Sequence, residues 1–290
     1  MTEWAIWDAA LLRWGAPLLA AACLWWASTG LIFLLDRVWP PAQTLAAATL
    51  ALAFALAGAL GLREHDGVGA AYAGFICGLG VWAWHEVAFL TGFLSGPRQG
   101  RCPPGLRGWA RFRAASETIL HHELALAATL GLLALALWSS DNQMALWTFA
   151  LLWVMRLSAK LNLFFGAPNI SLELLPERLS HLPSYFGRGP VGLMFAASVG
   201  LGGLGTAALL AAAAQAEGGT QTGLLLLAGL LALAVLEHWF MASPLPDAAL
   251  WRWMLPPKAA RGRGRRGGAA AEAEGADPPA RERLMAAPAR

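Results

Sequence analysis

Seven apolar stretches, each long enough to cross a lipid bilayer, restrict this chain to a narrow set of folds. A spanning helix needs about 20 consecutive apolar residues. The stretches lie at about residues 16–35, 43–62, 68–94, 117–138, 144–166, 190–214 and 222–242. Because lipid offers no hydrogen-bond partners to the backbone, each stretch is expected to be a helix. The sequence therefore predicts an all-α, polytopic membrane bundle of about seven transmembrane helices.

The composition agrees with this interpretation and excludes other classes of protein. Hydrophobic residues make up 57% of the chain and charged residues 13%, whereas soluble chains have about 45–50% and about 25%. A soluble enzyme and a disordered chain are both excluded. The net charge of +3 predicts no nucleic acid as a partner, since charge in such a chain reports topology. The expected surroundings are the lipid bilayer.

Basic residues fall almost entirely on one side of the predicted bundle. Of the 21 Lys and Arg residues, 17 lie in the loops near 36–42, 95–116 and 167–189 or in the C-terminal tail, and only Arg13 and Arg63 lie on the opposite side. The positive-inside rule places the C-terminus in the cytoplasm and the N-terminus outside. We expect residues 1–15 to be a periplasmic interfacial segment, 16–257 the seven-helix domain, and 258–290 a disordered basic cytoplasmic tail.

Polar side chains interrupt four of the predicted spans, where each ionisable group costs about 2.5–3.5 kcal/mol on insertion scales. They are His85, Glu86, Glu117, His121, His122, Glu123, Arg156, Lys160, Asn162, Glu237 and His238. At about 1.5 Å per residue, all of them except Glu117 lie about 6–15 Å from the cytoplasmic ends of their helices. Glu117 is expected to open the fourth span and to share a face with His121. We therefore predict one polar cluster in the cytoplasmic half of the bundle.

Three uses of this cluster remain open from the residues alone. Imidazoles and carboxylates suit iron, manganese or zinc, and the candidate metal ligands are His85, Glu86, His121, His122, Glu123, Glu237 and His238. Histidine could instead be the axial ligand of a tetrapyrrole. The third use is a structural network of buried ion pairs and hydrogen bonds, in which Arg156 and Lys160 offset part of the glutamate charge.

Two glycine patterns are interpreted as close helix contacts. Gly200, Gly202 and Gly205 match the spacing of a dinucleotide fingerprint, but they lie in an apolar span with no preceding strand. Gly74 and Gly78 have the spacing of small residues at a membrane helix interface. We expect neither pattern to bind a nucleotide.

Several longer segments resemble the PuhE-type photosynthetic complex assembly proteins of purple bacteria, over about residues 18–255. These segments are WWASTGLI at 25–32, WAWHE at 82–86, CPPG at 102–105, HELAL at 122–126, KLNLFFG at 160–166, LPERL at 175–179, SYF at 184–186, EHWF at 237–240 and PLPDAALWRW at 244–253. The resemblance coincides with most of the predicted cluster, namely His85, Glu86, His122, Glu123, Lys160, Asn162, Glu237 and His238. Glu117 and His121 are less tied to it.

The resemblance implies a multi-pass protein of the bacterial inner, intracytoplasmic photosynthetic membrane. It implies a role in assembling the reaction centre and light-harvesting complex or in supplying bacteriochlorophyll, with their subunits or pigment-synthesis enzymes as partners. It carries over no catalytic residue. We therefore expect an assembly factor whose cluster binds bacteriochlorophyll or another tetrapyrrole. The alternatives are a membrane metalloenzyme of pigment metabolism, with a divalent metal at the His/Glu site, and a non-catalytic structural scaffold.

Overall fold

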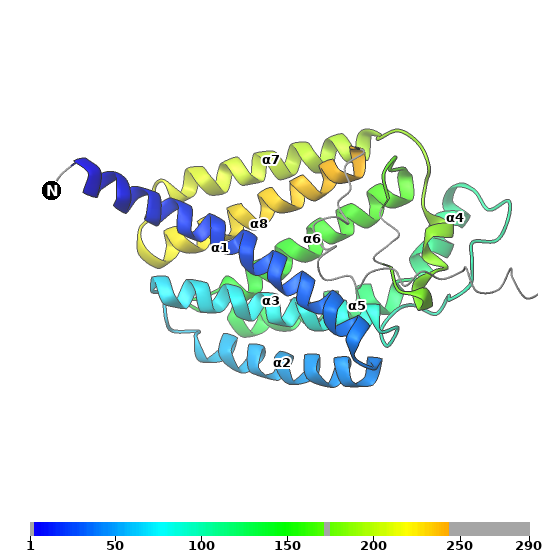
Figure 1. Ribbon diagram of the computed structural model, residues 1–290, viewed down its shortest axis with the longest axis horizontal. Helices are drawn as coiled ribbons and strands as arrows, with labels where there is room; N and C mark the ends of the chain where they lie inside the picture. Colours follow the sequence, from blue (N-terminus) through cyan, green and yellow to red (C-terminus); the bar gives the residue numbers. More distant parts are fainter. Residues whose placement is uncertain (1–2, 171–174, 244–290) are drawn as a thin grey trace, which may run out of the picture. The chain divides into compact units, whose positions relative to one another are not determined.

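The computed structural model describes residues 3–170 and 175–243, with side chains from residue 11 onward. In this part of the chain, seven helices are long and apolar enough to cross a membrane, which confirms the predicted fold class. The expected basic tail, 258–290, lies outside the described residues. Eight α-helices are described (Figure 1): α1 Glu3–Val38, α2 Pro41–Gly61, α3 Val68–Leu90, α4 Gly108–Glu117, α5 Leu120–Leu137, α6 Met144–Phe165, α7 Leu193–Ala213 and α8 Gly218–Ala242. Two 3₁₀ turns, Glu177–Leu179 and Leu182–Tyr185, lie between α6 and α7.

The boundaries differ from the predicted ones at three places. Helix α1 runs without a break from Glu3 to Val38, so no boundary separates the expected interfacial segment 1–15 from the first span. Helix α3 ends at Leu90 rather than near residue 94, because Gly92 takes a left-handed conformation with φ 76°. The short helix α4, which does not span the membrane, precedes α5, and the chain turns at Thr118 and Ile119 between them.

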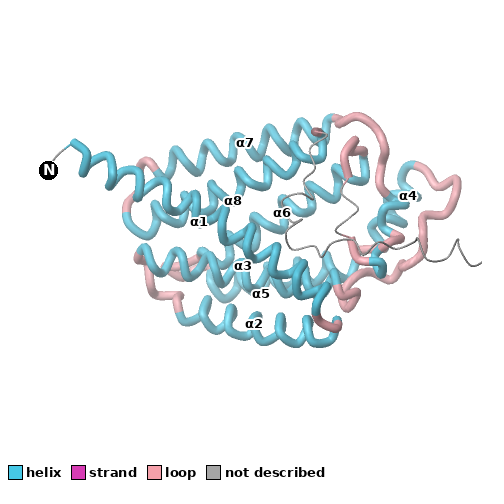
Figure 2. The backbone as a smooth tube through the Cα atoms, viewed as in Figure 1, coloured by secondary structure: helices cyan, strands magenta, loops and turns pink. Residues whose placement is uncertain are grey.

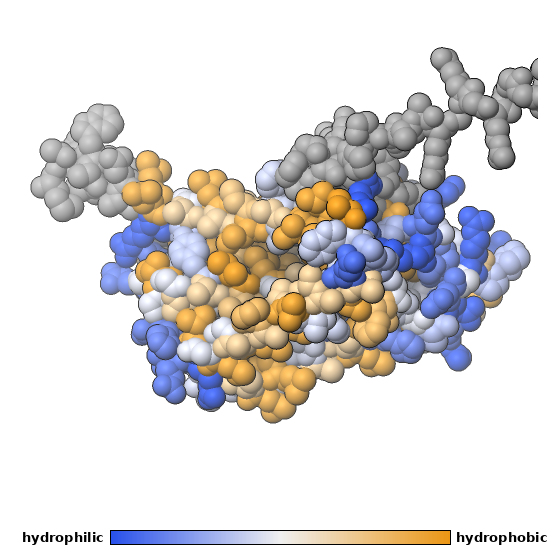
Figure 3. Space-filling view, turned by 60° about the horizontal axis from the view of Figure 1, so that its bottom comes forward, coloured by the Kyte–Doolittle hydropathy of each residue, from blue (hydrophilic) through white to orange (hydrophobic). Residues whose placement is uncertain are grey.

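The connections differ in length at the two ends of the bundle. Short turns join α2 to α3, α5 to α6 and α7 to α8 at one end, whereas the longer segments 91–107, 166–170 and 175–192 lie at the other (Figure 2). We call the latter the long-loop end. On the face shown in Figure 3, the surface between the ends is mostly apolar, and hydrophilic side chains gather at both ends. This division is the one that a spanning bundle requires.

Helix α3 lies at the centre of the bundle and packs against α1, α2, α5, α6 and α8. Of its most apolar window, 56% is buried, against 11% for α1. The apolar faces that remain uncovered on the outer helices have the composition that contact with lipid requires. The polar residues of α3 are therefore held between neighbouring helices, not at the lipid surface.

Both glycine patterns contribute close helix contacts, although Gly200 itself makes none. A Cβ atom at Gly78 would lie 2.7 Å from the Thr148 Cβ of α6, and one at Gly202 would lie 2.5 Å from a methyl group of Val235 on α8. These distances are shorter than van der Waals contact, so a larger residue would force the helices apart. The glycines thus bring α6 and α7 close to the polar side chains of α3 and α8.

Candidate functional site

A cavity of about 590 Å³ opens among α1, α3, α6 and α8 toward the long-loop end. Its walls are mostly apolar and include Trp25 and Phe33 of α1, Trp82 and Phe89 of α3, and Leu230 of α8. Five ionisable side chains from the spans also line it, namely Glu86, Glu123, Arg156, Lys160 and Glu237. Ligand pockets commonly measure about 300–1,000 Å³ and combine apolar walls with a few placed polar groups. The cavity has both properties.

Two ion pairs cross the cavity wall from α6. Arg156 Nη2 lies 3.3 Å from Glu86 Oε2 on α3, and Lys160 Nζ lies 2.6 Å from Glu123 Oε1 on α5. Trp153 Nε1 donates a 2.9 Å hydrogen bond to the other oxygen of Glu123. The spacing of four residues along α6 places both cations on one face, which is the reason that both pairs reach the same space.

The two pairs differ in how tightly they are enclosed. The Arg156 side chain is 45% exposed and meets its carboxylate through one nitrogen, whereas the Lys160 and Glu123 side chains are only 16% and 18% exposed. A guanidinium carries five N–H donors, so Arg156 can offer further donors to the cavity. Glu86 Oε1 is buried and has no hydrogen-bond partner in the described structure. The Arg156–Glu86 pair therefore presents donor and acceptor capacity to the space beside it.

A His and a Glu are adjacent in the sequence at three places, on α3, α5 and α8. On each of these helices the two side chains point into different surroundings. Glu86, Glu123 and Glu237 line the cavity, whereas His85, His122 and His238 are not among its lining residues and are almost completely buried. Successive residues on an α-helix point about 100° apart. A helix that turns its glutamate toward the cavity therefore turns the adjacent histidine into a neighbouring helix.

His85 and His122 lie together between α3 and α5. Their ring centroids are 6.4 Å apart, and His85 Nε2 shares a 3.0 Å hydrogen bond with Thr129 Oγ1. His122 packs against Phe89, which lines the cavity on its other side, at 4.7 Å between ring centroids. Both nitrogens of His122 and Nδ1 of His85 have no hydrogen-bond partner in the described structure. This pair is separated from the cavity by apolar side chains.

The remaining predicted residues, Asn162 and His238, belong to a third group between α6, α7 and α8. Ser158 Oγ lies 2.9 Å from His238 Nε2 and 2.8 Å from Ser198 Oγ. Asn162 Nδ2 donates to the Ser198 hydroxyl at 2.9 Å and to the Ser158 carbonyl at 3.0 Å. A hydroxyl beside an imidazole is the arrangement of an activated nucleophile, but none of these four side chains lines the cavity. We call this group the α7 network, because it joins α7 to α6 and α8.

The prediction that Glu117 opens the fourth span beside His121 is wrong. Glu117 ends α4, where Arg98 Nη2 lies 2.8 Å and Arg113 Nε 3.2 Å from its carboxylate. The hydrogen bond from Arg98 lowers the pKa of Glu117 below its ordinary value. The helix breaks because the backbone at Gly96 packs directly against Glu117 and Thr118. His121 lies after the break, on the exposed face of α5.

The predicted single cluster thus separates into three groups, with Glu117 and His121 outside all of them, and the donor set does not favour a metal ion. Among the described residues, no three His, Cys, Asp or Glu side chains gather closely enough to hold one. His85 hydrogen-bonds to Thr129 and His238 to Ser158, and neither histidine lines the cavity with the glutamates. Histidine ligation of a tetrapyrrole within the cavity does not fit either, since the polar groups on its wall are carboxylate, guanidinium and ammonium.

Sequence reasoning missed the serines of the α7 network and the cavity itself. Ser158 precedes Asn162 by four residues, a helical spacing that could have revealed a shared face. Ser198 was hidden because small hydroxyl residues are common in spans. No pattern in the sequence reveals which residues line the cavity, since Trp, Phe and Leu occur equally on helix surfaces that face lipid.

Comparison with known proteins assigns the sequence that forms this site to a family. A curated relative from Rhodobacter capsulatus, described as an uncharacterised 30.4 kDa protein in the puhA 5′ region, is 40% identical over 194 residues, which cover 67% of this chain and 71% of the relative. No solved structure matches the chain. Residues 11–262 match the family described as protein of unknown function DUF3623. This match includes all seven spans and the whole described cavity, so the chain belongs to the DUF3623 family.

Proposed function

We propose that this protein is an integral-membrane assembly factor for a bacterial photosynthetic complex and that its cavity binds bacteriochlorophyll or a biosynthetic precursor. The observation that carries the proposal is the cavity of about 590 Å³ with five ionisable side chains on an otherwise apolar wall. An ionisable residue within a span is costly and usually marks a binding or transport function. Five of them around one space favour a ligand with a large apolar body and a polar head.

Two further findings support the choice of ligand. The Rhodobacter capsulatus relative is described by its position in the puhA 5′ region, which supports a photosynthetic role for this chain. The segments that resemble the PuhE-type assembly proteins include Trp82–Glu86, Lys160–Gly166 and Glu237–Phe240, and each of these segments contributes residues to the cavity wall. The resemblance and the cavity therefore meet at the same residues.

In the proposed complex, the apolar wall covers the macrocycle and the charged wall holds its polar substituents. Arg156 can donate hydrogen bonds to ring carbonyl or carboxylate oxygens, while the Glu86 oxygen that meets no partner in the described part of the chain can accept one from the ligand. The bound pigment would supply the absorption bands by which it can be detected. Histidine has no direct role in this arrangement.

The basic loops support a cytoplasmic orientation of the long-loop end. Segments 91–107 and 166–192, with α4, carry Arg98, Arg101, Arg107, Arg111, Arg113, Arg178 and Arg188. The positive-inside rule assigns such loops to the cytoplasm. In that orientation, the loops above the cavity can contact a reaction-centre or antenna subunit during assembly, or a pigment-synthesis enzyme.

Optical spectroscopy of the gently purified protein tests the proposal. We expect a tetrapyrrole band in the protein from a photosynthetic host, or saturable uptake of added bacteriochlorophyll a by the protein from a host without pigment. Glu237→Gln and Arg156→Met should each weaken uptake by about tenfold or more, as expected for loss of a charged hydrogen bond. His121→Gln, at an exposed position on α5, is the matched control. Absence of any band together with no uptake would refute pigment binding.

A further inference from the structure

One wall of the cavity is built by a segment that has little regular structure of its own. Residues 175–186, which we call the cap, contribute Leu175, Leu182, Tyr185 and Phe186 to the cavity lining. The cap contains only the two 3₁₀ turns, of three and four residues. Turns of this length are not stable alone, so the position of the cap depends on its contacts with the helices.

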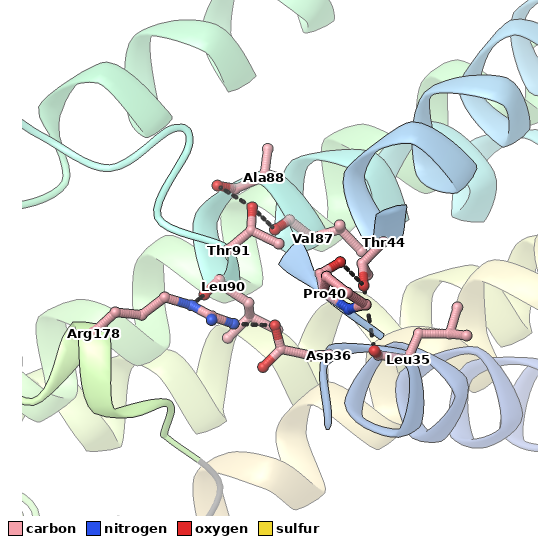
Figure 4. A network of polar contacts seen from close by, with 9 residues as sticks. All are labelled: Leu35, Asp36, Pro40, Thr44, Val87, Ala88, Leu90, Thr91 and Arg178. Atoms are coloured by element: carbon pink, nitrogen blue, oxygen red, sulfur yellow. Dashed lines mark hydrogen bonds and ion pairs between the residues drawn. The ribbon is translucent and has the colours of Figure 1, made fainter. Parts of the chain in front are cut away.

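Arg178 makes the polar contacts between the cap and two of the cavity helices. Its guanidinium donates to the Asp36 carboxylate near the end of α1 and to the Leu90 carbonyl at the end of α3 (Figure 4). The last carbonyl groups of a helix have no partner within the helix. The Thr91 hydroxyl donates to the carbonyls of Val87 and Ala88, while Arg178 occupies that of Leu90.

Apolar contacts join the same three elements at the same point. Leu179 and Leu182 of the cap are buried against Phe89 and Leu90 of α3, with Phe33 of α1 packed beside them. Phe33, Phe89, Leu90 and Leu182 also line the cavity. Movement of the cap away from α1 and α3 would therefore remove part of the cavity wall.

The other end of the cap is fixed more firmly. The Tyr185 hydroxyl donates a 2.9 Å hydrogen bond to the Gly100 carbonyl, and Arg111 Nη2 donates one of 2.7 Å to the Tyr185 carbonyl. The Ser184 hydroxyl accepts a 2.8 Å hydrogen bond from the Cys102 amide. These three contacts tie residues 184–185 to the segment before α4 and to α4 itself. By contrast, within the described residues it is the Arg178 side chain that supplies the polar contacts of the first half of the cap with α1 and α3.

We propose that Arg178 and Asp36 form a latch that holds the cap closed over the cavity, and that a ligand enters and leaves at the long-loop end when this latch opens. The Arg178 side chain is 31% exposed and that of Asp36 12% exposed, so water or a partner can reach the latch from outside. Residues 184–185 form the hinge about which the cap moves. The inference rests on the proposed function only in assuming that the cavity takes a ligand.

A thiol on the cavity wall reports the state of the latch without any pigment. Ser28 lines the cavity from α1, and Ser28→Cys places a thiol there with little change in volume. The rate of its modification by N-ethylmaleimide, followed by mass spectrometry in the full-length detergent-purified protein, measures access to the cavity. Arg178→Gln and Asp36→Asn should each raise this rate about tenfold, as expected for loss of a charged hydrogen bond. Arg178→Lys, which keeps the charge but loses the two-way contact of the guanidinium, should give an intermediate rate.

Internal controls separate opening of the cap from unfolding. Arg188→Gln removes an exposed charge after the hinge and should leave the rate unchanged. The natural Cys77, packed against the core between α2 and α3, should remain as slow as in the wild type. The double variant Asp36→Asn with Arg178→Gln should label no faster than Arg178→Gln alone, because both substitutions remove the same ion pair.

Three results would overturn the latch. They are an unchanged rate at Ser28→Cys, an equal acceleration at Cys77, and additive effects in the double variant. The proposed function fails by a different measurement, the lack of pigment uptake, while thiol labelling still shows whether the latch gates the cavity.

Discussion

The cavity wall and the α7 network place polar groups in the same apolar bundle in two different ways. In the α7 network, Asn162 and His238 are 2% and 1% exposed, and each has close hydrogen-bond partners. At the cavity wall, Arg156 is 45% exposed and one oxygen of Glu86 has no hydrogen-bond partner among the described residues. A closed network satisfies its own polar groups and fixes helices, whereas an open one retains capacity for a ligand. Burial and the satisfaction of hydrogen-bonding groups, more than polarity, therefore distinguish a binding site from a structural joint.

The largest expected effect comes from the more enclosed ion pair of the cavity. Glu123→Gln leaves the Lys160 ammonium, 16% exposed, without its carboxylate. We expect the free energy of unfolding to fall by about 3–5 kcal/mol, as for a buried pair that loses one partner. Titration with sodium dodecyl sulfate in mixed micelles measures the change.

Two further variants test whether the burial of the Lys160–Glu123 ion pair is the cause of this loss of stability. Adding Lys160→Met to Glu123→Gln should recover most of the loss, because no charge then remains buried. Glu86→Gln should cost about 1 kcal/mol or less, since Arg156 keeps its access to the cavity. Equal losses for Glu86→Gln and Glu123→Gln would show that the two pairs do not differ as their exposures indicate.

A smaller loss of stability is expected for variants of the α7 network, and these variants should leave pigment binding unchanged. Asn162→Ala removes the donor to Ser198 and should lower the free energy of unfolding by about 1–3 kcal/mol. Uptake of bacteriochlorophyll a, measured at a temperature at which the variant is folded, should stay at the wild-type level. Glu237→Gln is the converse variant, with weaker uptake and little loss of stability. If Asn162→Ala impaired uptake as strongly as Glu237→Gln, the α7 network could not be a purely structural contact distinct from the binding site at the cavity wall.

The close contact beside the α7 network should respond to a single methyl group. Gly202→Ala places a Cβ against Val235 and should cost about 1–3 kcal/mol by overpacking. Gly203→Ala is the matched control, because a Cβ there meets no atom within 4 Å. Thermal unfolding of the two variants compares them directly. A loss of stability for both would mean that the effect does not arise from contact with α8.

Hydropathy predicted the spans, since length and apolar composition are enough to define a membrane helix. It could not predict how each helix is rotated, because its sides facing lipid and its sides facing protein are equally apolar. His85 and Glu86 illustrate the consequence. They are adjacent in sequence and were assigned to one cluster, yet the histidine packs toward Thr129 and the glutamate lines the cavity.

The break between α4 and α5 was hidden for a different reason. Glu117 and His121 have helical spacing, and the residues between them contain no Pro or Gly. The break arises from the approach of Gly96, about twenty residues earlier in the chain, against the backbone at Glu117. A contact between segments so far apart has no local pattern in the sequence.

The smallest expected effect concerns an ion pair outside the bundle, between Glu117 at the end of α4 and Arg98. The hydrogen bond from Arg98 lowers the pKa of Glu117, so the ionised carboxylate is favoured in the folded protein. Its stabilisation of α4 is complete above the ordinary pKa of 4.5 and is lost as the pH falls through the lowered value. Protection of residues 108–117 from hydrogen exchange, corrected for the intrinsic rate, should therefore decrease in this acid range. Glu117→Gln should abolish that pH dependence, whereas Glu177→Gln, at an exposed position in the cap, should preserve it. A decrease that persists in Glu117→Gln would assign the acid sensitivity of this end to another group.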